Sequence, residues 1–235
     1  TASDNTAIGL SSLKLNVTGT ANTAVGKDAL RANLADNNTA VGMDALTANT
    51  TGADNVAFGT ETMVSNTTGD ANTALGRGAL ASNSTADNNT AVGRSALLAN
   101  TTGTRNVAVG TYSLDANTTA NDNTAVGYNA ATAITTGASN TAIGHNALLL
   151  HTDASDNVAI GEYAGGAITT GGQNTLVGGK AGDGITTASS LTAFGYRALS
   201  APSCTGANNT AVGTDALLSN TTGSENVAVG TAALD

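Results

Sequence analysis

Apolar and polar residues recur along this chain in a unit that returns every 17 residues. The unit reads approximately N-T-A-V-G-x-x-A-L-x-x-N-T-T-G-x-x, and we number its positions from 1, the Asn, to 17. Successive position-5 glycines are 17 residues apart, with one gap of 16 before Gly42 and one of 18 before Gly213. The pattern runs from end to end, so we expect a single repetitive domain over residues 1–235. The marker glycines of the fourteen units are Gly9, Gly26, Gly42, Gly59, Gly76, Gly93, Gly110, Gly127, Gly144, Gly161, Gly178, Gly195, Gly213 and Gly230.

A period of this length is too short for a pair of helices, because helix-pair repeats need about 34 residues or more. It suits one coil of a solenoid, built from two short strands and two turns. The Val, Ile and Thr of the N-T-A-V segment favour a strand, while the following Gly and the T-T-G segment are typical of corners. The sequence therefore predicts an all-β fold, a parallel β-solenoid or β-roll of about fourteen 17-residue coils.

Residue size differs between the two faces of the expected strand. Strand side chains alternate between faces, so positions 2 and 4 share one face and positions 3 and 5 share the other. Position 2 is always Thr or Val, position 4 is always Val, Ile, Leu or Phe, and position 3 is Ala in every unit except the one with Leu176. We interpret the first face as filled with bulk, and the second as kept small where another backbone approaches closely.

Substitutions that occur together indicate two core positions. Position 9 is Leu or Met in eleven units, and position 12 is usually Asn. The three units that lack a large residue at position 9 have Ile at position 12. We expect this Ile to fill the space of the missing Leu, because voids in a close-packed interior cost stability. The three pairs are Ala131 with Ile134, Gly165 with Ile168, and Gly182 with Ile185.

Asn occupies position 1 in every unit except the one that begins at Leu191. Stacked Asn side chains can hydrogen-bond to one another along a ladder. Alternatively, each Asn satisfies the backbone of its own turn. Both roles are structural, and either explains the recurrence of Asn without a ligand.

Composition excludes several classes of function. The formal net charge of −9 disfavours nucleic acid as a partner, because proteins that bind it usually present a basic face, and it disfavours anionic membrane surfaces. No apolar run approaches the roughly 20 residues of a membrane-spanning helix, so we expect no membrane insertion. With no Trp and only two Phe, the core must be thin and made of small side chains.

Few residues are candidates for chemistry. His145 and His151 lie at positions 6 and 12 of one unit, but no third ligand with metal-site spacing accompanies them. Cys204 lies near Pro202 in the unit with one extra residue, which we expect to bulge outward, and no base for a catalytic thiol is identifiable. A single Cys also rules out an internal disulfide framework. We therefore predict no catalytic, cofactor-binding or metal site, and no enzymatic activity.

Pairs of Thr at positions 13 and 14 suggest an alternative function. Such pairs include Thr67-Thr68 and Thr101-Thr102, and a regular Thr array on a solenoid face is a known arrangement for binding ice. Adjacent residues usually point to opposite faces, so each pair offers one outward Thr. The array is interrupted at Leu34, Asp153 and Cys204.

The segment N-T-A-V-G-x-x-A-L resembles the S-V-A-I-G-x-x-A-x-A repeat in the head of trimeric autotransporter adhesins, whose coils are shorter. The longer unit from Asn209 to Gly223 is similar to repeats of phage tail fibres and related bacterial surface proteins. The resemblance implies a left-handed parallel β-roll and trimerisation through a face of small residues, here positions 3 and 5. It also implies an extracellular location, on a cell surface or a virion, and adhesion or fibre-stalk duty.

These observations favour a structural rod, a segment of a phage tail fibre or bacterial surface fibre, that self-associates as a homotrimer. A cell-surface receptor or glycan is a candidate partner. The chain starts four residues before Asn5 and stops inside a unit at Asp235. We therefore expect either a piece of a longer fibre or ends that join, because uncapped solenoid ends expose strand edges. The alternatives are a self-assembling extracellular filament of stacked subunits and an ice-binding β-solenoid that uses its Thr ladders.

Overall fold

The computed structural model describes residues 2–235. It has two compact units, one ending at Asn121 and the other running from Asp122 to Asp235. The described residues contain strands and turns but no helix, and each strand is three residues long. The strands are β1 (Thr6–Ile8), β2 (Thr23–Val25), β3 (Thr39–Val41), β4 (Val56–Phe58), β5 (Thr73–Leu75), β6 (Thr90–Val92) and β7 (Val107–Val109) in the first unit, and β8 (Thr124–Val126), β9 (Thr141–Ile143), β10 (Val158–Ile160), β11 (Thr175–Val177), β12 (Thr192–Phe194), β13 (Thr210–Val212) and β14 (Val227–Val229) in the second.

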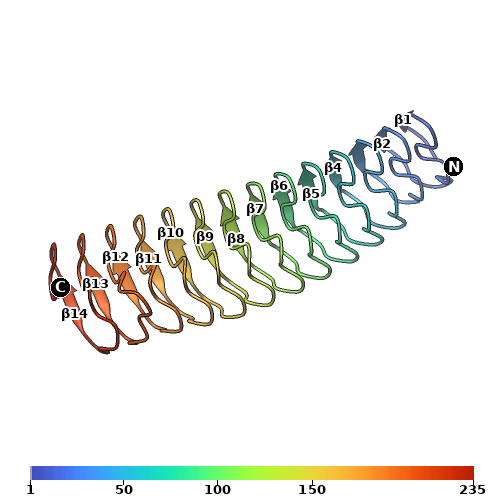
Figure 1. Ribbon diagram of the computed structural model, residues 1–235. Coiled ribbons are helices and arrows are strands. Elements are labelled where there is room, and N and C mark those ends of the chain that lie inside the picture. Colours follow the sequence, from blue (N-terminus) through green and yellow to red (C-terminus); the bar gives the residue numbers. More distant parts are fainter. Residues whose placement is uncertain (1) are drawn as a thin grey trace. The chain divides into compact units, whose positions relative to one another are not determined.

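Each unit is a parallel β-solenoid in which one coil stacks on the next. Within each unit every strand pairs in parallel with the strand of the following coil (Figure 1). The register is the same at each step, because equivalent repeat positions face each other, as Thr73 faces Thr90 and Leu75 faces Val92. The all-β, parallel solenoid predicted from the 17-residue period is confirmed.

Each coil has one strand instead of the two that we predicted. The remainder of the coil consists of turns, in which the backbone N–H of Ala79 donates to the carbonyl of Gly76 and that of Asn83 to the carbonyl of Leu80. Backbone conformation explains why a second strand does not form. Positions 7 and 9 are left-handed in the repeats, with φ of 59° at Asp44 and 51° at Leu46, and a strand requires negative φ.

The core is narrow and lies on the side of the strands that carries the small residues. Ala at positions 3 and 8 and Leu at position 9 are fully buried, as Ala74, Ala79 and Leu80 illustrate. The neighbouring Thr73 and Leu75 are exposed. The small face, which the adhesin resemblance assigned to a trimer interface, is inside each coil, and positions 2 and 4 face outward. A coil this thin has room for Ala and one Leu per turn, and bulkier residues remain outside.

Position-5 glycines allow the coils to stack closely. Gly93 has φ of 136°, a conformation that residues with a Cβ rarely adopt. A Cβ placed on it would lie 2.5 Å from the carbonyl oxygen of Gly110 in the next coil. The expected close approach of another backbone is confirmed, and the approaching backbone belongs to the adjacent coil of the same chain.

The paired substitutions at positions 9 and 12 do fill one space. A Cβ on Gly165 would lie 3.1 Å from Cδ1 of Ile168 and 2.9 Å from Cδ1 of Leu176. A Cβ on Gly182 would lie 2.6 Å from Cδ1 of Ile185. All three branched side chains are fully buried, so they occupy the volume that a position-9 Leu takes in other coils.

The buried Asn residues form ladders between coils, which is one of the two roles that the sequence left open for position 1. At position 1, Oδ1 of Asn55 accepts the backbone N–H of Asn72 in the next coil at 3.0 Å, and Nδ2 of Asn72 donates to the carbonyl of Ala86, 14 residues further along the chain, at 2.8 Å. At position 12, Nδ2 of Asn66 donates to Oδ1 of Asn49 in the previous coil at 2.9 Å. Both Asn columns therefore join neighbouring coils, and the position-12 Asn also closes its own turn, as Nδ2 of Asn66 does by donating to the carbonyl of Gly69 at 3.0 Å. These bonds satisfy buried backbone groups.

Candidate functional site

The most extensive feature that the fold presents to a partner is the outward side of its strands. We name the side that carries positions 2 and 4 the outer strand face. Position 4 is apolar in every coil, and neither position is ever charged. Exposure is high for the largest side chains, 52% for Phe58 and 56% for Phe194. The other large apolar residues of this face that are more than a third exposed are Ile8, Val56, Leu75, Ile143, Ile160, Val227 and Val229.

Backbone pairing between coils determines what the outer strand face presents to a partner. The strand backbones already hydrogen-bond to neighbouring coils, as the amide of Thr73 does to the carbonyl of Asn89 at 2.9 Å. The face therefore offers side chains, and not free backbone edges, to a partner. Its Val, Ile, Leu and Phe side chains can pack and exclude water, and large exposed apolar surfaces are typical of sites of association.

The register makes the outer strand face regular. Within each unit the same position recurs once per coil, at the spacing of about 4.8 Å that neighbouring strands have. Val41, Phe58 and Leu75, for example, are direct partners on successive strands. A surface of this kind is a ladder of apolar side chains without charge, whereas charged residues occupy other positions of the repeat.

The structure separates the two candidate histidines. His145 is on the surface, with its ring centroid 5.7 Å from that of Tyr128 and 5.4 Å from that of Tyr163, and its Nδ1 lies 3.7 Å from Glu162. His151 is fully buried at position 12. One candidate histidine is therefore a surface residue, and the other is part of the core.

Cys204 differs from its expected place. Pro202 and Ser203 form the exposed part of the irregular coil, but Cys204 itself is buried and forms an isolated parallel bridge with Ile185. Burial raises the pKa of its thiol, which disfavours the thiolate that a nucleophile needs. The extra residue therefore bulges outward before Cys204, and the cysteine side chain lies in the core.

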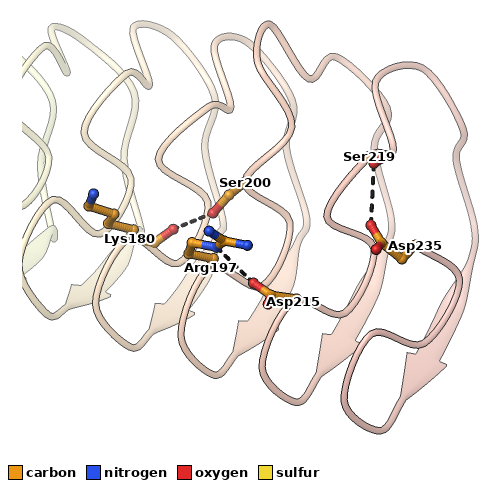
Figure 2. A network of polar contacts seen from close by, with 6 residues as sticks. All are labelled: Lys180, Arg197, Ser200, Asp215, Ser219 and Asp235. Atoms are coloured by element: carbon orange, nitrogen blue, oxygen red, sulfur yellow. Dashed lines mark hydrogen bonds and ion pairs between the residues drawn. The ribbon is translucent and has the colours of Figure 1, made fainter.

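Polar contacts near the end of the second unit link neighbouring coils (Figure 2). Arg197 Nε lies 2.7 Å from Oδ1 of Asp215, the hydroxyl of Ser200 donates to the carbonyl of Lys180, and that of Ser219 donates to Asp235 at 3.3 Å. The groups pair with one another across successive coils, so the arrangement is that of structural cross-links. Over residues 2–235 no group of three His, Cys, Asp or Glu is arranged to hold a metal ion, and no helix is long and apolar enough to span a membrane.

The Thr pairs divide as expected into one inward and one outward residue. The hydroxyl of Thr67 at position 13 donates to the carbonyl of Ser84 in the next coil at 3.0 Å, whereas Thr68 at position 14 is exposed. The exposed column runs without interruption through five coils of the first unit. It consists of Thr51, Thr68, Thr85, Thr102 and Thr119.

Comparisons of this chain with protein-family models, with curated proteins and with solved structures find no match.

We did not predict from the sequence that positions 2 and 4 face outward, although one feature of the sequence indicates it. One 17-residue repeat has Leu at position 3, Leu176, and the same repeat has Gly182 at position 9 and Ile185 at position 12. Position 3 therefore varies together with two core positions, which places it inside the coil and positions 2 and 4 outside.

Proposed function

We propose that this chain is a non-enzymatic structural rod, a segment of a phage tail fibre or bacterial surface fibre, whose copies associate through the outer strand face into a homotrimer. The observation that carries the proposal is the charge-free ladder on that face, which is apolar at position 4 of every coil within each unit. Large exposed apolar surfaces mark sites of association. The resemblance of the repeat to tail-fibre and adhesin repeats supports an extracellular place for such a rod.

A second copy of the chain is the partner that fits best. It carries the same ladder with the same spacing, so parallel copies in register place apolar side chains against apolar side chains along the whole length of contact. Charges elsewhere on an acidic chain (net −9) repel in a way that disfavours contacts through other faces. The Ala and Gly of positions 3 and 5 cannot form the interface suggested by the adhesin resemblance, since Ala at position 3 is buried within its own coil.

Two Asp substitutions on adjacent strands test the proposal. Light scattering on a sizing column should give a mass near three chains for the natural protein. Changing Phe58→Asp together with Leu75→Asp should reduce it to the mass of one chain, because two buried carboxylates would lack partners at the interface. Both native side chains are exposed in the single chain, so circular dichroism should show the fold unchanged.

The matched control places the same two charges on another exposed column of the same coils. Thr68→Asp together with Thr85→Asp alters position 14, where Asp153 occurs naturally in another coil. This variant should keep the mass of the natural protein. A natural protein of single-chain mass, or a Phe58/Leu75 variant that still associates, would contradict association through the outer strand face. Very large heterogeneous species would indicate a filament of stacked subunits instead.

Ice binding is a second candidate, supported by the exposed Thr column of the first unit. One Thr per coil gives a single line of hydroxyl and methyl groups at the spacing of the coils. If this column binds ice, the natural protein inhibits ice recrystallisation and the Thr68→Asp/Thr85→Asp variant does not. The same control variant therefore distinguishes the two functions, because it should leave the mass unchanged.

A further inference from the structure

A hollow of about 380 Å³ opens on the surface of the first unit, away from the outer strand face. It lies over positions 6, 7 and 10 of neighbouring coils, and Gly78 at position 7 is one of its lining residues. A Cβ on Gly78 would meet nothing closer than Cδ1 of Leu98 at 3.6 Å. The missing side chain therefore leaves open space that other coils fill with a side chain at this position.

Backbone conformation does not require glycine there. Gly78 has φ of 68°, but Glu61 and Ser95 adopt φ of 57° and 56° at the same position of the adjacent coils. These residues carry side chains in the same left-handed region. The consequence of glycine at this coil is thus the hollow itself, which is within the range of small-ligand pockets, about 300–1,000 Å³.

Four charged side chains surround the hollow, and their charges cancel. Arg77 and Arg94 lie at position 6 of consecutive coils, and Asp44 and Glu61 lie at position 7. Arg77 Nη2 is 3.5 Å from Glu61 Oε2, and both side chains are well exposed, 68% and 47%. An exposed pair of this length contributes little to stability, so a ligand can replace it at little cost. Balanced donors and acceptors favour a neutral ligand that both donates and accepts hydrogen bonds.

The remaining wall of the hollow is apolar. Val64, Ala81 and Leu98 lie at position 10 of three consecutive coils and line one side, and Leu98 is 37% exposed. Guanidinium and carboxylate groups make paired, planar hydrogen bonds. A surface with such groups on one side and a strip of methyl groups on the other matches a sugar ring, which has hydroxyl edges and an apolar C–H face.

We propose that this hollow binds a short neutral saccharide. Arg77 and Arg94 donate to its hydroxyl or ring oxygens, Glu61 accepts from its hydroxyls, and the ring packs against Val64 and Leu98. The site is separate from the association of copies and does not depend on it.

Nuclear magnetic resonance of methyl-labelled protein tests the proposal, with lactose, maltose and cellobiose as probes at millimolar concentration. At least one of these disaccharides should shift the methyl resonances of Val64, Ala81 and Leu98 in a saturable way. Sodium glucuronate and sodium sulfate are the comparison ligands. Saturable shifts with these anions alone, or with none of the probes, would overturn the proposal of a neutral-saccharide site.

Two variants and two controls locate the binding. Gly78→Asn fills the hollow with a residue that the fold accepts at position 7 in Asn129 and Asn146, both with left-handed φ. It should weaken binding by about tenfold or more, and so should Arg94→Gln, since one hydrogen bond to a charged group contributes roughly this much. Ala232→Asn also places Asn at position 7, and Arg31→Gln also removes the charge of an arginine, but neither residue lines the hollow. Both variants should therefore leave the affinity unchanged. Equal affinity in all four variants would show that any saccharide binds elsewhere.

Discussion

Replacing Gly93 by Ala is expected to lower the free energy of unfolding by about 3 kcal/mol or more, from steric overlap and an unfavourable φ together. The new Cβ would lie 2.5 Å from the carbonyl oxygen and 2.6 Å from the carbonyl carbon of Gly110. Neither backbone can move without separating two coils. Urea unfolding followed by circular dichroism measures the loss.

Gly78→Ala is the matched control for this substitution. It also introduces a methyl group at a glycine with positive φ, 68°, but the new Cβ would be 3.6 Å from its nearest neighbour. We expect a loss of about 1 kcal/mol, the usual cost of left-handed φ for a residue with a Cβ. Equal losses in Gly93→Ala and Gly78→Ala would show that close stacking at position 5 does not limit stability.

The second large effect concerns the shared space of positions 9 and 12. Leu148 is fully buried, and Leu148→Ala should destabilise the protein by about 2–5 kcal/mol, the range for deleting a buried Leu side chain. Adding His151→Ile should restore part of that loss. The double variant recreates the combination present in the flanking coils, Ala131 with Ile134 and Gly165 with Ile168.

His151→Ile alone is the control, because it adds an apolar side chain where Leu148 already fills the space. It should give no gain comparable to the rescue, since overpacking also costs stability. The measurement is the urea midpoint of the natural protein, both single variants and the double variant. If the double variant is no more stable than Leu148→Ala, the two positions do not share one volume.

Acid should also weaken the fold through His151. Its Nε2 lies 2.7 Å from the carbonyl of Ala154, so Nε2 carries the proton and donates, and burial lowers the pKa of the ring from 6.5. The unfolded chain therefore takes up a proton at a higher pH than the folded chain does. The stability contributed by the neutral ring is complete above about pH 6.5 and is lost as pH falls toward the lowered folded pKa.

His151→Asn tests this dependence. Asn restores the usual residue of position 12, which donates to the same turn carbonyl in other coils, as Asn66 does to Gly69 at 3.0 Å. Urea midpoints at about pH 7.5 and about pH 5.5 should differ more for the natural protein than for the variant. The same shift in both proteins would assign the acid effect to other groups.

Much of the fold follows from the sequence because the chain repeats. The 17-residue period set the length of a coil, and the alternation of Thr, Ala and Val located the strand. Compensation between residues such as Gly182 and Ile185 identified core positions, since volume is conserved wherever side chains share one interior. These properties are visible without coordinates because each repeat serves as a comparison for the others.

The assignment of inside and outside required the tertiary structure. Alternation along a three-residue strand defines two faces but does not say toward which one the chain turns. The turn is set by left-handed residues such as Asp44 and Leu46. Left-handed φ costs a residue such as Leu roughly 1–2 kcal/mol, so local preference opposes it. Hydrogen bonds between coils stabilise it, including that from the amide of Leu46 to the carbonyl of Thr62.

The positions of the proposed binding surfaces also depend on which face of each strand lies inside the coil. Sequence alone determined the repeat, the parallel stacking and the residues that compensate in the core. The structure turned Ala inward and placed Phe58 and Leu75 on the outer strand face, and it brought Arg77, Arg94 and Glu61 around the space left by Gly78. Contacts between coils fix the direction in which the backbone curls, and that direction decides which side chains a partner can reach.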